Sequence, residues 1–320
     1  MKKILITGGA GFIGSHLGQS LAASGDCQID LIDNFSRTGN NPEIISRDLR
    51  QPNVLDDLGR DYNLIYHFAA LLGVANVLEK PFEVLCDNTL MVTRVLEFAQ
   101  LQKKLQRFIF ASTSEVYAGT LRYFQMQIPT PETTPLTVTD LSSPRSSYML
   151  SKIYGEALCH YAGVPFTILR PHNIYGPRMG SSHVIPQLLE KAHYAEKGGE
   201  LEVYSPTHRR TFCYIDDALR WIRFASEKSS TLGQTLNVGN NSPEISMRDL
   251  AKLVAEVVGK DLKIVERSDT EGSPTRRAPD NSRIISSTGS KSAVDLRSGV
   301  ERTYDWYRKN IFNFHRVSSK

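Results

Sequence analysis

The sequence contains little cysteine, and its cysteines do not cluster. Cys27, Cys86, Cys159 and Cys213 stand far apart in the chain. Zinc sites and disulfide frameworks usually show cysteines in close, regularly spaced pairs. We therefore predict no metal site and no disulfide framework, and we expect a reducing cytoplasm as the location.

Long apolar runs are also missing. The longest apolar stretch, residues 64–78, is interrupted by His67 and Asn76 and is too short to cross a bilayer. Only two lysines separate Met1 from the first apolar run, which leaves no room for an export signal. We therefore expect no membrane anchor and no contact with a membrane.

Neither sign of charge dominates. The chain carries 38 Lys and Arg against 34 Asp and Glu, a formal net charge of +4, and the two signs are interspersed. This pattern argues against a nucleic-acid partner and suits a small anionic substrate. With 320 residues, 40% of them hydrophobic, the chain can build the core of one large α/β domain or of two closely joined ones.

The most informative stretch is KKILITGGAGFIG, residues 2–14. Its apolar run breaks into glycines and then into the pair Phe12-Ile13, which predicts a buried strand, a tight turn and the start of a helix. Gly8, Gly11 and Gly14 would serve the turn, the close approach of a ligand and helix packing. Free N–H groups at the helix N-terminus would then cradle a pyrophosphate. Taken alone, the loop also fits an ordinary strand-to-helix turn.

Further strand-like runs alternate with helix-like segments. This alternation predicts an α/β fold, a Rossmann-type, doubly wound parallel sheet with right-handed crossovers. The runs are residues 28–32, 63–68, 107–111, 166–169 and 235–238.

Asp33 and Asn34 follow the run at 28–32, which is the second strand of the predicted sheet, and stand close to twenty residues past the glycine turn. A carboxylate at this place can bind the adenosine ribose hydroxyls and would repel a 2′-phosphate, which favours NAD over NADP. A solvated aspartate in a turn would look the same in sequence.

Two polar clusters carry the candidate chemistry. Thr113, Ser114 and Glu115 follow a buried-strand pattern, at the strand end where open α/β sheets bind ligands. Tyr148 and Lys152 stand four residues apart and share a helix face. A nearby ammonium lowers the pKa of a tyrosine and makes it a usable general base. Taken singly, the clusters also fit an exposed loop and a surface Tyr-Lys pair.

In this order, the glycine loop, Asp33, the Thr-Ser-Glu cluster and the Tyr-x-x-x-Lys pair resemble the extended short-chain dehydrogenases. The glycine loop has two residues between its first two key glycines, which resembles that family's spacing. The resemblance is specific to the NAD-dependent nucleotide-sugar epimerase, dehydratase and decarboxylase group. It extends over nearly the whole chain through RPHNIYGPR at 170–178, RTFCYIDD at 210–217, RRAPD at 276–280 and a closing helix at 296–307.

The resemblance implies NAD as the cofactor and a nucleotide-diphosphate sugar as the substrate. The adenine would lie near the Asp48-Leu49 pair, and Asn88 would buttress the active site. Arg210 and Arg277 resemble arginines that bind the diphosphate. The implied cofactor-binding residues are Gly8, Gly11, Phe12, Ile13, Gly14, Asp33, Asn34, Asp48, Leu49, Phe68, Ala69, Ala70, Asn88, Tyr148 and Lys152, and the substrate-binding residues are Asn173, Arg178, Arg210 and Arg277.

The resemblance also implies a first chemical step. Tyr148 would take the proton of a sugar hydroxyl, normally at C4, while the nicotinamide oxidises that carbon. Thr113 would hydrogen-bond the same oxygen, and Lys152 would bind the nicotinamide ribose. A 4-epimerase needs no further acid or base.

Dehydratases and uronate decarboxylases resemble this chain in having a glutamate at the position of Glu115. Arg277 stands in an RRxPD segment that resembles the decarboxylases, and Ser114 replaces the aspartate of one dehydratase branch. We therefore expect C4 oxidation followed by decarboxylation or elimination, as in a UDP-uronate decarboxylase or a 4,6-dehydratase. The alternatives are a 4-epimerase and, in another class, an NAD(H)-binding regulatory protein without catalysis.

By the same resemblance, residues 1–170 and 209–241 would form the NAD-binding domain, and 171–208 and 242–320 a smaller α+β domain that binds the nucleotide sugar. Helices around 90–101 and 154–161 would form a four-helix homodimer interface, although burial within one subunit would also explain their apolar faces. The chain departs from the family in an insert at 120–144, which would shape a substrate pocket, form an oligomer surface or be a plain surface loop.

Overall fold

The protein folds around a seven-stranded, all-parallel sheet. This computed structural model describes residues 1–36, 38–39, 41–138, 140–270 and 273–313. The strand order is β11-β6-β5-β4-β1-β2-β3, so the chain starts near the middle and winds outward in both directions, which confirms the predicted doubly wound sheet. The strands are β1 (Lys2–Thr7), β2 (Cys27–Asp33), β3 (Ile45–Ser46), β4 (Leu64–His67), β5 (Arg107–Ala111), β6 (Phe166–Pro171) and β11 (Thr235–Val238).

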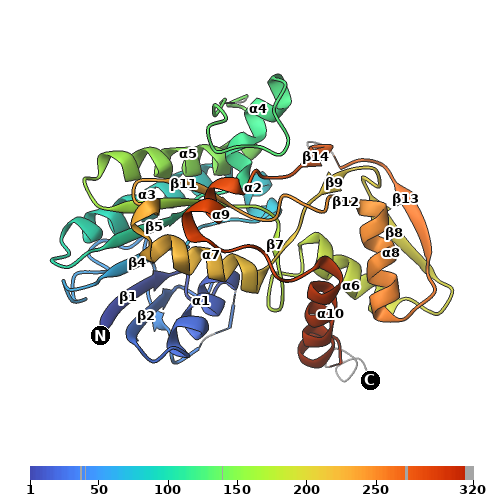
Figure 1. The fold of residues 1–320 in the computed structure, drawn as a ribbon, viewed down its shortest axis with the longest axis horizontal. Helices are drawn as coiled ribbons and strands as arrows, with labels where there is room; N and C mark the ends of the chain where they lie inside the picture. Colours follow the sequence, from blue (N-terminus) through green and yellow to red (C-terminus); the bar gives the residue numbers. More distant parts are fainter. Residues whose placement is uncertain (37, 40, 139, 271–272, 314–320) are drawn as a thin grey trace.

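Helices cover both faces of the sheet, as Figure 1 shows. Alternate residues of β1 enter different cores: Ile4 and Ile6 belong to one buried cluster, and Leu5 belongs to the other. This is the period-2 pattern of a strand buried on both faces. The helices of one face are α1 (Phe12–Ala22) and α7 (Ile215–Glu227), and those of the other are α2 (Val74–Glu79), α3 (Pro81–Gln100) and α5 (Arg145–Tyr161).

After β6 the chain builds a second region beside the carboxyl ends of the strands (Figure 1). Its helices are α6 (Val184–Tyr194), α8 (Met247–Val258) and α10 (Leu296–Tyr307), the last at the predicted place, followed by a π-helical turn at Arg308–Phe312. Its strands are β7 (Ile174–Tyr175), β8 (Glu200–Tyr204), β9 (Arg209–Arg210), β10 (Cys213–Tyr214), β12 (Ile245–Ser246), β13 (Lys263–Arg267) and β14 (Arg276–Arg277), and α9 (Ser282–Thr288) and a 3-10 turn, η2 (Ser229–Thr231), complete the fold.

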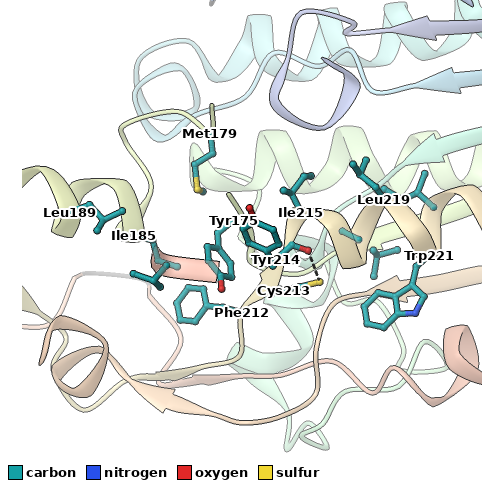
Figure 2. Packing of buried hydrophobic residues seen from close by; sticks show 14 of the residues in the cluster. Tyr175, Met179, Ile185, Leu189, Phe212, Cys213, Tyr214, Ile215, Leu219 and Trp221 are labelled. Atoms are coloured by element: carbon teal, nitrogen blue, oxygen red, sulfur yellow. Dashed lines mark hydrogen bonds between the residues drawn. The ribbon is translucent and has the colours of Figure 1, made fainter. Parts of the chain in front are cut away.

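One hydrophobic core joins this region to the sheet. Figure 2 shows Tyr175, Phe212 and Tyr214 side by side where β7 and β10 pair, with Ile215 and Trp221 continuing the cluster along α7. Tyr175 packs edge-on against both Phe212 and Tyr214. The two regions therefore share buried surface, which holds the second region over the strand ends.

The insert at 120–144 is partly buried. It begins inside a short helix, α4 (Ala118–Tyr123), which follows a 3-10 turn, η1 (Ser114–Tyr117). Phe124 and Leu141 are exposed, but Thr130 is buried and forms an isolated parallel bridge with Pro279. The insert is therefore packed against the second region, and a plain surface loop does not describe it.

No helix in the described part of the chain combines the length and the apolar character that crossing a membrane requires.

Candidate active site

The glycine loop closes tightly onto the end of β4. Gly8 has φ +73°, and a Cβ on it would lie 2.7 Å from the Ala69 nitrogen. A Cβ on Gly14 would lie 2.2 Å from the Gly8 carbonyl oxygen. Gly11 occupies the N-cap of α1, where no described side chain caps the helix and the first turn holds no acidic residue. The amide groups and positive end of α1 are thus available to an anion, which fits the pyrophosphate of NAD.

Asp33 ends β2 beside this loop. Its Oδ2 accepts the Ala10 N–H at 3.0 Å and its Oδ1 accepts the Phe35 N–H at 2.8 Å. Each carboxylate oxygen has a further lone pair for a ribose hydroxyl. The predicted adenine residues Asp48 and Leu49 lie just past β3, where hydrogen bonds from Arg50 are the main cause of a lowered Asp48 pKa. These residues fit the adenosine half of NAD.

Asn88 joins the segment after β4 to the helix α5. The side chain is buried on α3, its Oδ1 accepts the Leu71 N–H at 2.7 Å, and its Nδ2 donates to the Leu71 carbonyl at 3.0 Å. Nδ2 also lies 3.3 Å from the Ser151 hydroxyl on α5. The predicted cofactor residues Phe68, Ala69 and Ala70 immediately precede Leu71, so Asn88 fixes the backbone that they form.

Tyr148 and Lys152 lie on the face of α5 that packs on the sheet. Gly155 allows this close packing, because a Cβ there would lie 2.3 Å from the ring of Phe110 on β5. Lys152 Nζ donates to the Ala111 carbonyl at 2.8 Å and lies 5.7 Å from the centre of the Tyr148 ring. The predicted Tyr-Lys pair is therefore held at the carboxyl end of β5.

Burial shifts the pKa values of Lys152 and of its neighbour His67. It lowers the pKa of Lys152 to about 8. His67, at the end of β4, hydrogen-bonds Thr7 at 2.8 Å, and burial, followed by the charge of Lys152, lowers its pKa to about 3. At neutral pH His67 is thus an uncharged core residue, whereas Lys152 is positively charged.

Thr113, Ser114 and Glu115 form the turn that follows β5. Thr113 caps η1, with its hydroxyl accepting the Glu115 N–H at 3.2 Å. Arg277 Nη1 donates to Glu115 Oε1 at 2.7 Å and lies 3.4 Å from the Ser114 hydroxyl. The Arg277 side chain is 16% exposed and that of Glu115 is 43% exposed, so the ion pair borders open space. The structure thus joins two predicted residues that are 162 positions apart.

Further positive charge surrounds Glu115. The charge of Arg277 is the largest cause of a lowered Glu115 pKa, and Arg145 and Arg210 act in the same direction. Sequence reasoning missed Arg145, although it opens α5 three residues before Tyr148, a spacing that shares one helix face. The charges of three arginines therefore act on the Glu115 carboxylate, and Arg277 is the one that contacts it.

The predicted substrate residues fall into separate groups. Asn173 and Arg210 line a cavity of about 340 Å³ in the second region. Arg210 is hydrogen-bonded to Ser273 at 3.0 Å, and burial, followed by repulsion from Arg277, lowers its pKa to about 10, so it stays charged at neutral pH. Arg178 is exposed and is not among the described residues lining that cavity. The others in the lining are Ser182, Val184, Gln187, Leu188, Lys191, Glu202, Val203, Tyr204, Ser205, His208, Phe212, Met247, Thr270 and Ser273.

Known proteins of one family resemble this chain in sequence and in structure. The chain is 32% identical to the UDP-N-acetyl-alpha-D-glucosaminuronate decarboxylase of Bacillus cytotoxicus, an alignment that covers 96% of this chain and 98% of that protein. It superposes on the UDP-glucose 4-epimerase of Thermotoga maritima with a TM-score of 0.85 and 26% identity, covering 97% of this chain and all of that one.

The UDP-glucuronic acid 4-epimerase of Bacillus cereus, solved with UDP-glucuronic acid and NAD, matches with a TM-score of 0.78 and 27% identity over 96% of this chain and 99% of that chain. The profile of the NAD dependent epimerase/dehydratase family matches residues 4–239. This match covers more than half of the chain and agrees with the predicted cofactor, NAD. The chain belongs to the NAD dependent epimerase/dehydratase family.

Proposed function

We propose that this protein is an NAD-dependent decarboxylase of a nucleoside-diphosphate-linked uronic acid. The observation that carries the proposal is the contact of Arg277 with Glu115 and Ser114 at the end of β5. The similarity to a decarboxylase of a UDP-linked uronate adds support.

The charge balance favours a substrate with a carboxylate. Arg277, Arg145 and Arg210 all lower the pKa of one acidic side chain, Glu115, and Arg277 contacts it. A neutral hexose would bring no anionic group to Arg277, whereas a carboxylate at C6 would pair with its guanidinium. We assign Arg277 to that carboxylate and its ladder neighbour Arg210 to the diphosphate.

The same contacts argue against a dehydratase. A dehydratase would need Glu115 to remove the C5 proton as a general base. Arg277 is bonded to that carboxylate and lowers its pKa, which makes it a weak base. Decarboxylation removes no proton from C5, so an ionised Glu115 suits it better.

Tyr148, Thr113 and Lys152 would act together to remove the proton of the C4 hydroxyl. Tyr148 takes that proton, and the Thr113 hydroxyl donates a hydrogen bond to the C4 oxygen. Lys152 keeps its positive charge close to the Tyr148 ring and binds the nicotinamide ribose. NAD, when bound, accepts the two electrons of the C4 oxidation and later returns them.

Oxidation at C4 makes the substrate a β-keto acid. Its carboxylate leaves as carbon dioxide, and the electron pair of the broken C5–C6 bond moves onto the C4 oxygen as an enolate. Tyr148, now carrying the proton, and Thr113 stabilise that enolate. The proton that C5 then takes up comes from water, because the nearby Glu115 carboxyl group is ionised and has no proton to give.

The remaining assignments follow from the same placement. We propose that residues 1–170 and 209–241 bind NAD, and that 171–208 and 242–320 bind the nucleotide sugar, with its nucleoside in the cavity lined by Asn173. All four cysteines lie in the described part and none is paired, which supports a reducing cytoplasm as the location.

We also propose a homodimer. The helices α3 and α5 pack side by side and carry exposed apolar residues on their outer faces, among them Leu90 and Tyr154. Two copies of this surface would form a four-helix interface. The apolar exposure of these two helices supports the proposal.

The proposal is tested with purified protein, NAD and a panel of UDP-glucuronate, UDP-N-acetylglucosaminuronate and UDP-glucose. Mass spectrometry should show the loss of carbon dioxide from a uronate, and in heavy water the product should carry one deuterium at C5. Tyr148→Phe should abolish turnover. Loss of water from UDP-glucose, or a uronate of unchanged mass and altered stereochemistry by NMR, would instead identify a dehydratase or an epimerase. NAD binding without any turnover would point to a regulatory protein.

A further inference from the structure

Residues 127–132 of the insert, here called the strap, pair through Thr130 with the backbone that follows Arg277. The Thr130 N–H donates to the Ala278 carbonyl at 2.9 Å, and the Asp280 N–H donates to the Thr130 carbonyl at 2.8 Å. Thr130 is only 2% exposed. Backbone pairing of this kind fixes the position of residues 278–280, and Arg277 directly precedes them.

Asn237, at the centre of β11, connects the strap to the other half of the site. Its Nδ2 donates to the Thr130 carbonyl at 2.9 Å and to the Asp280 carbonyl at 3.1 Å. Its Oδ1 accepts the Tyr117 hydroxyl at 3.0 Å. Tyr117 ends the turn that carries Glu115, so one fully buried amide holds the segments that supply both members of the ion pair.

Glu132 holds the backbone of Asn237, and so the position from which this side-chain amide extends. Its Oε1 accepts the Asn237 backbone N–H at 2.8 Å, and its backbone carbonyl accepts Arg170 Nη1 at 3.2 Å. Arg170 in turn donates to the Tyr117 hydroxyl at 2.7 Å. The Glu132 side chain is 4% exposed, and its ion-pair partner, Arg283, lies 3.7 Å away. A carboxylate buried this deeply is costly to keep unless its contacts are needed.

We infer that Glu132 is a positioning residue for substrate selection. Through Asn237 and the strap, it sets the distance between Arg277 and Glu115 and so orients the guanidinium toward the substrate carboxylate. This inference rests on the proposed function, since it assigns the origin of the preference for a uronate over a neutral sugar.

The test compares the binding of UDP-glucuronate and UDP-glucose to the NAD-loaded protein by calorimetry, with every protein carrying Tyr148→Phe so that the uronate is bound without turnover. The ratio of the two dissociation constants measures the preference. The variants are Glu132→Ala, Glu132→Gln, Arg277→Lys and the double variant Glu132→Ala/Arg277→Lys. Asp217→Ala is the matched control, because Asp217 is another fully buried carboxylate that accepts backbone N–H groups, from Ala293 and Val294 at 3.0 Å, far from Arg277 in the sequence.

Glu132→Ala should reduce the preference about tenfold, as expected when a buried hydrogen bond that orients a charged group is lost. Glu132→Gln keeps an oxygen for the Asn237 N–H and should restore most of the preference. The double variant should be no worse than Arg277→Lys, since both changes remove the same orientation. Asp217→Ala should lower the melting temperature without changing the preference.

Two results would overturn the inference: a Glu132→Ala protein that keeps the wild-type preference, as the Asp217 control does, or losses that add in the double variant. If Glu132→Ala does not fold, Glu132→Asp replaces it, because it withdraws the carboxylate from Asn237 by one methylene, and the same outcomes apply. A wild-type protein that shows no preference for UDP-glucuronate would count against the proposed function itself, which separates the two failures.

Discussion

Lys152 carries a positive charge in a place where burial disfavours it. Burial lowers its pKa from 10.5 to about 8, while its Nζ stays hydrogen-bonded to the Ala111 carbonyl. His67, beneath Lys152, is uncharged at neutral pH. Lys152 is therefore the charged member of this pair of residues, and it lies close to the Tyr148 ring. The charge state of one buried lysine should therefore be visible in the pH dependence of the whole enzyme.

We predict that kcat/KM falls as the pH rises through about 8, because Lys152 then loses the proton that the mechanism needs. Lys152→Arg keeps its charge at every accessible pH, so its lower activity should show no alkaline limb near pH 8. The measurement is the pH profile of both proteins with the same substrate. An unchanged alkaline limb in the arginine variant would assign it to another group.

The same shift predicts a change in stability. Between pH 8 and pH 10.5 the unfolded chain holds a proton on Lys152 that the folded protein has released, so the free energy of unfolding rises with pH in this window. The expected gain is on the order of 2–3 kcal/mol. Urea unfolding of the NAD-free protein should show it relative to Lys152→Met, which has no such proton.

Single residues were predictable where a local pattern carries them. Tyr148 and Lys152 share a helix face, and Glu115 follows a strand, so both clusters could be found in the sequence. The contact of Glu115 with Arg277 could not, because it depends on how β14 pairs with β9. Glu132 was read only as part of a Thr- and Pro-rich insert, since every partner that buries it lies far along the chain.

At the scale of elements, the fit of α1 on β1 depends on Gly14. A Cβ there would lie 2.2 Å from the Gly8 carbonyl oxygen, a backbone atom that cannot move away without opening the loop. The helix and the glycine loop are therefore one unit, and the orientation of the helix N-terminus depends on this contact.

We predict that Gly14→Ala lowers the free energy of unfolding by about 2–3 kcal/mol and weakens NAD binding. Gly18→Ala on the same helix is the matched control, because its Cβ would meet only the Leu31 side chain, at 3.0 Å. The control should bind NAD normally. Thermal unfolding and NAD titration by fluorescence measure both effects, and equal losses in the two variants would contradict this explanation.

The long strands were predictable and the short ones were not. The runs at 107–111 and 235–238 match β5 and β11 residue for residue, because apolar side chains buried on both faces leave a clear pattern. The two-residue strands β9, β12 and β14 have no such pattern. Their partners come from distant segments, and tertiary pairing alone makes them strands.

At the scale of the whole molecule, α3 and α5 leave an apolar surface uncovered. Leu90 is 38% exposed and Tyr154 is 46% exposed. We predict that the double variant Leu90→Glu/Tyr154→Glu raises the dimer dissociation constant about 100-fold or more, because two charges would be buried at the interface. Leu232→Glu is the control, because Leu232, near β11, is 49% exposed and so also carries an apolar side chain on the surface. Light scattering across a dilution series measures the mass, and a monomeric wild-type protein would contradict the prediction.

The ion pair between Arg277 and Glu115 also has a consequence for how the protein avoids wrong ligands. Glu115 acts as an internal counter-ion that occupies the guanidinium in the free protein. A small anion from the cell, such as phosphate or chloride, must displace it unaided. The proposed substrate, a nucleotide-linked uronate, would arrive already anchored by its nucleotide, so its carboxylate would compete at a high effective concentration. The carboxylate of Glu115 thus makes the arginine cluster a poor trap for common anions while leaving it open to a tethered one.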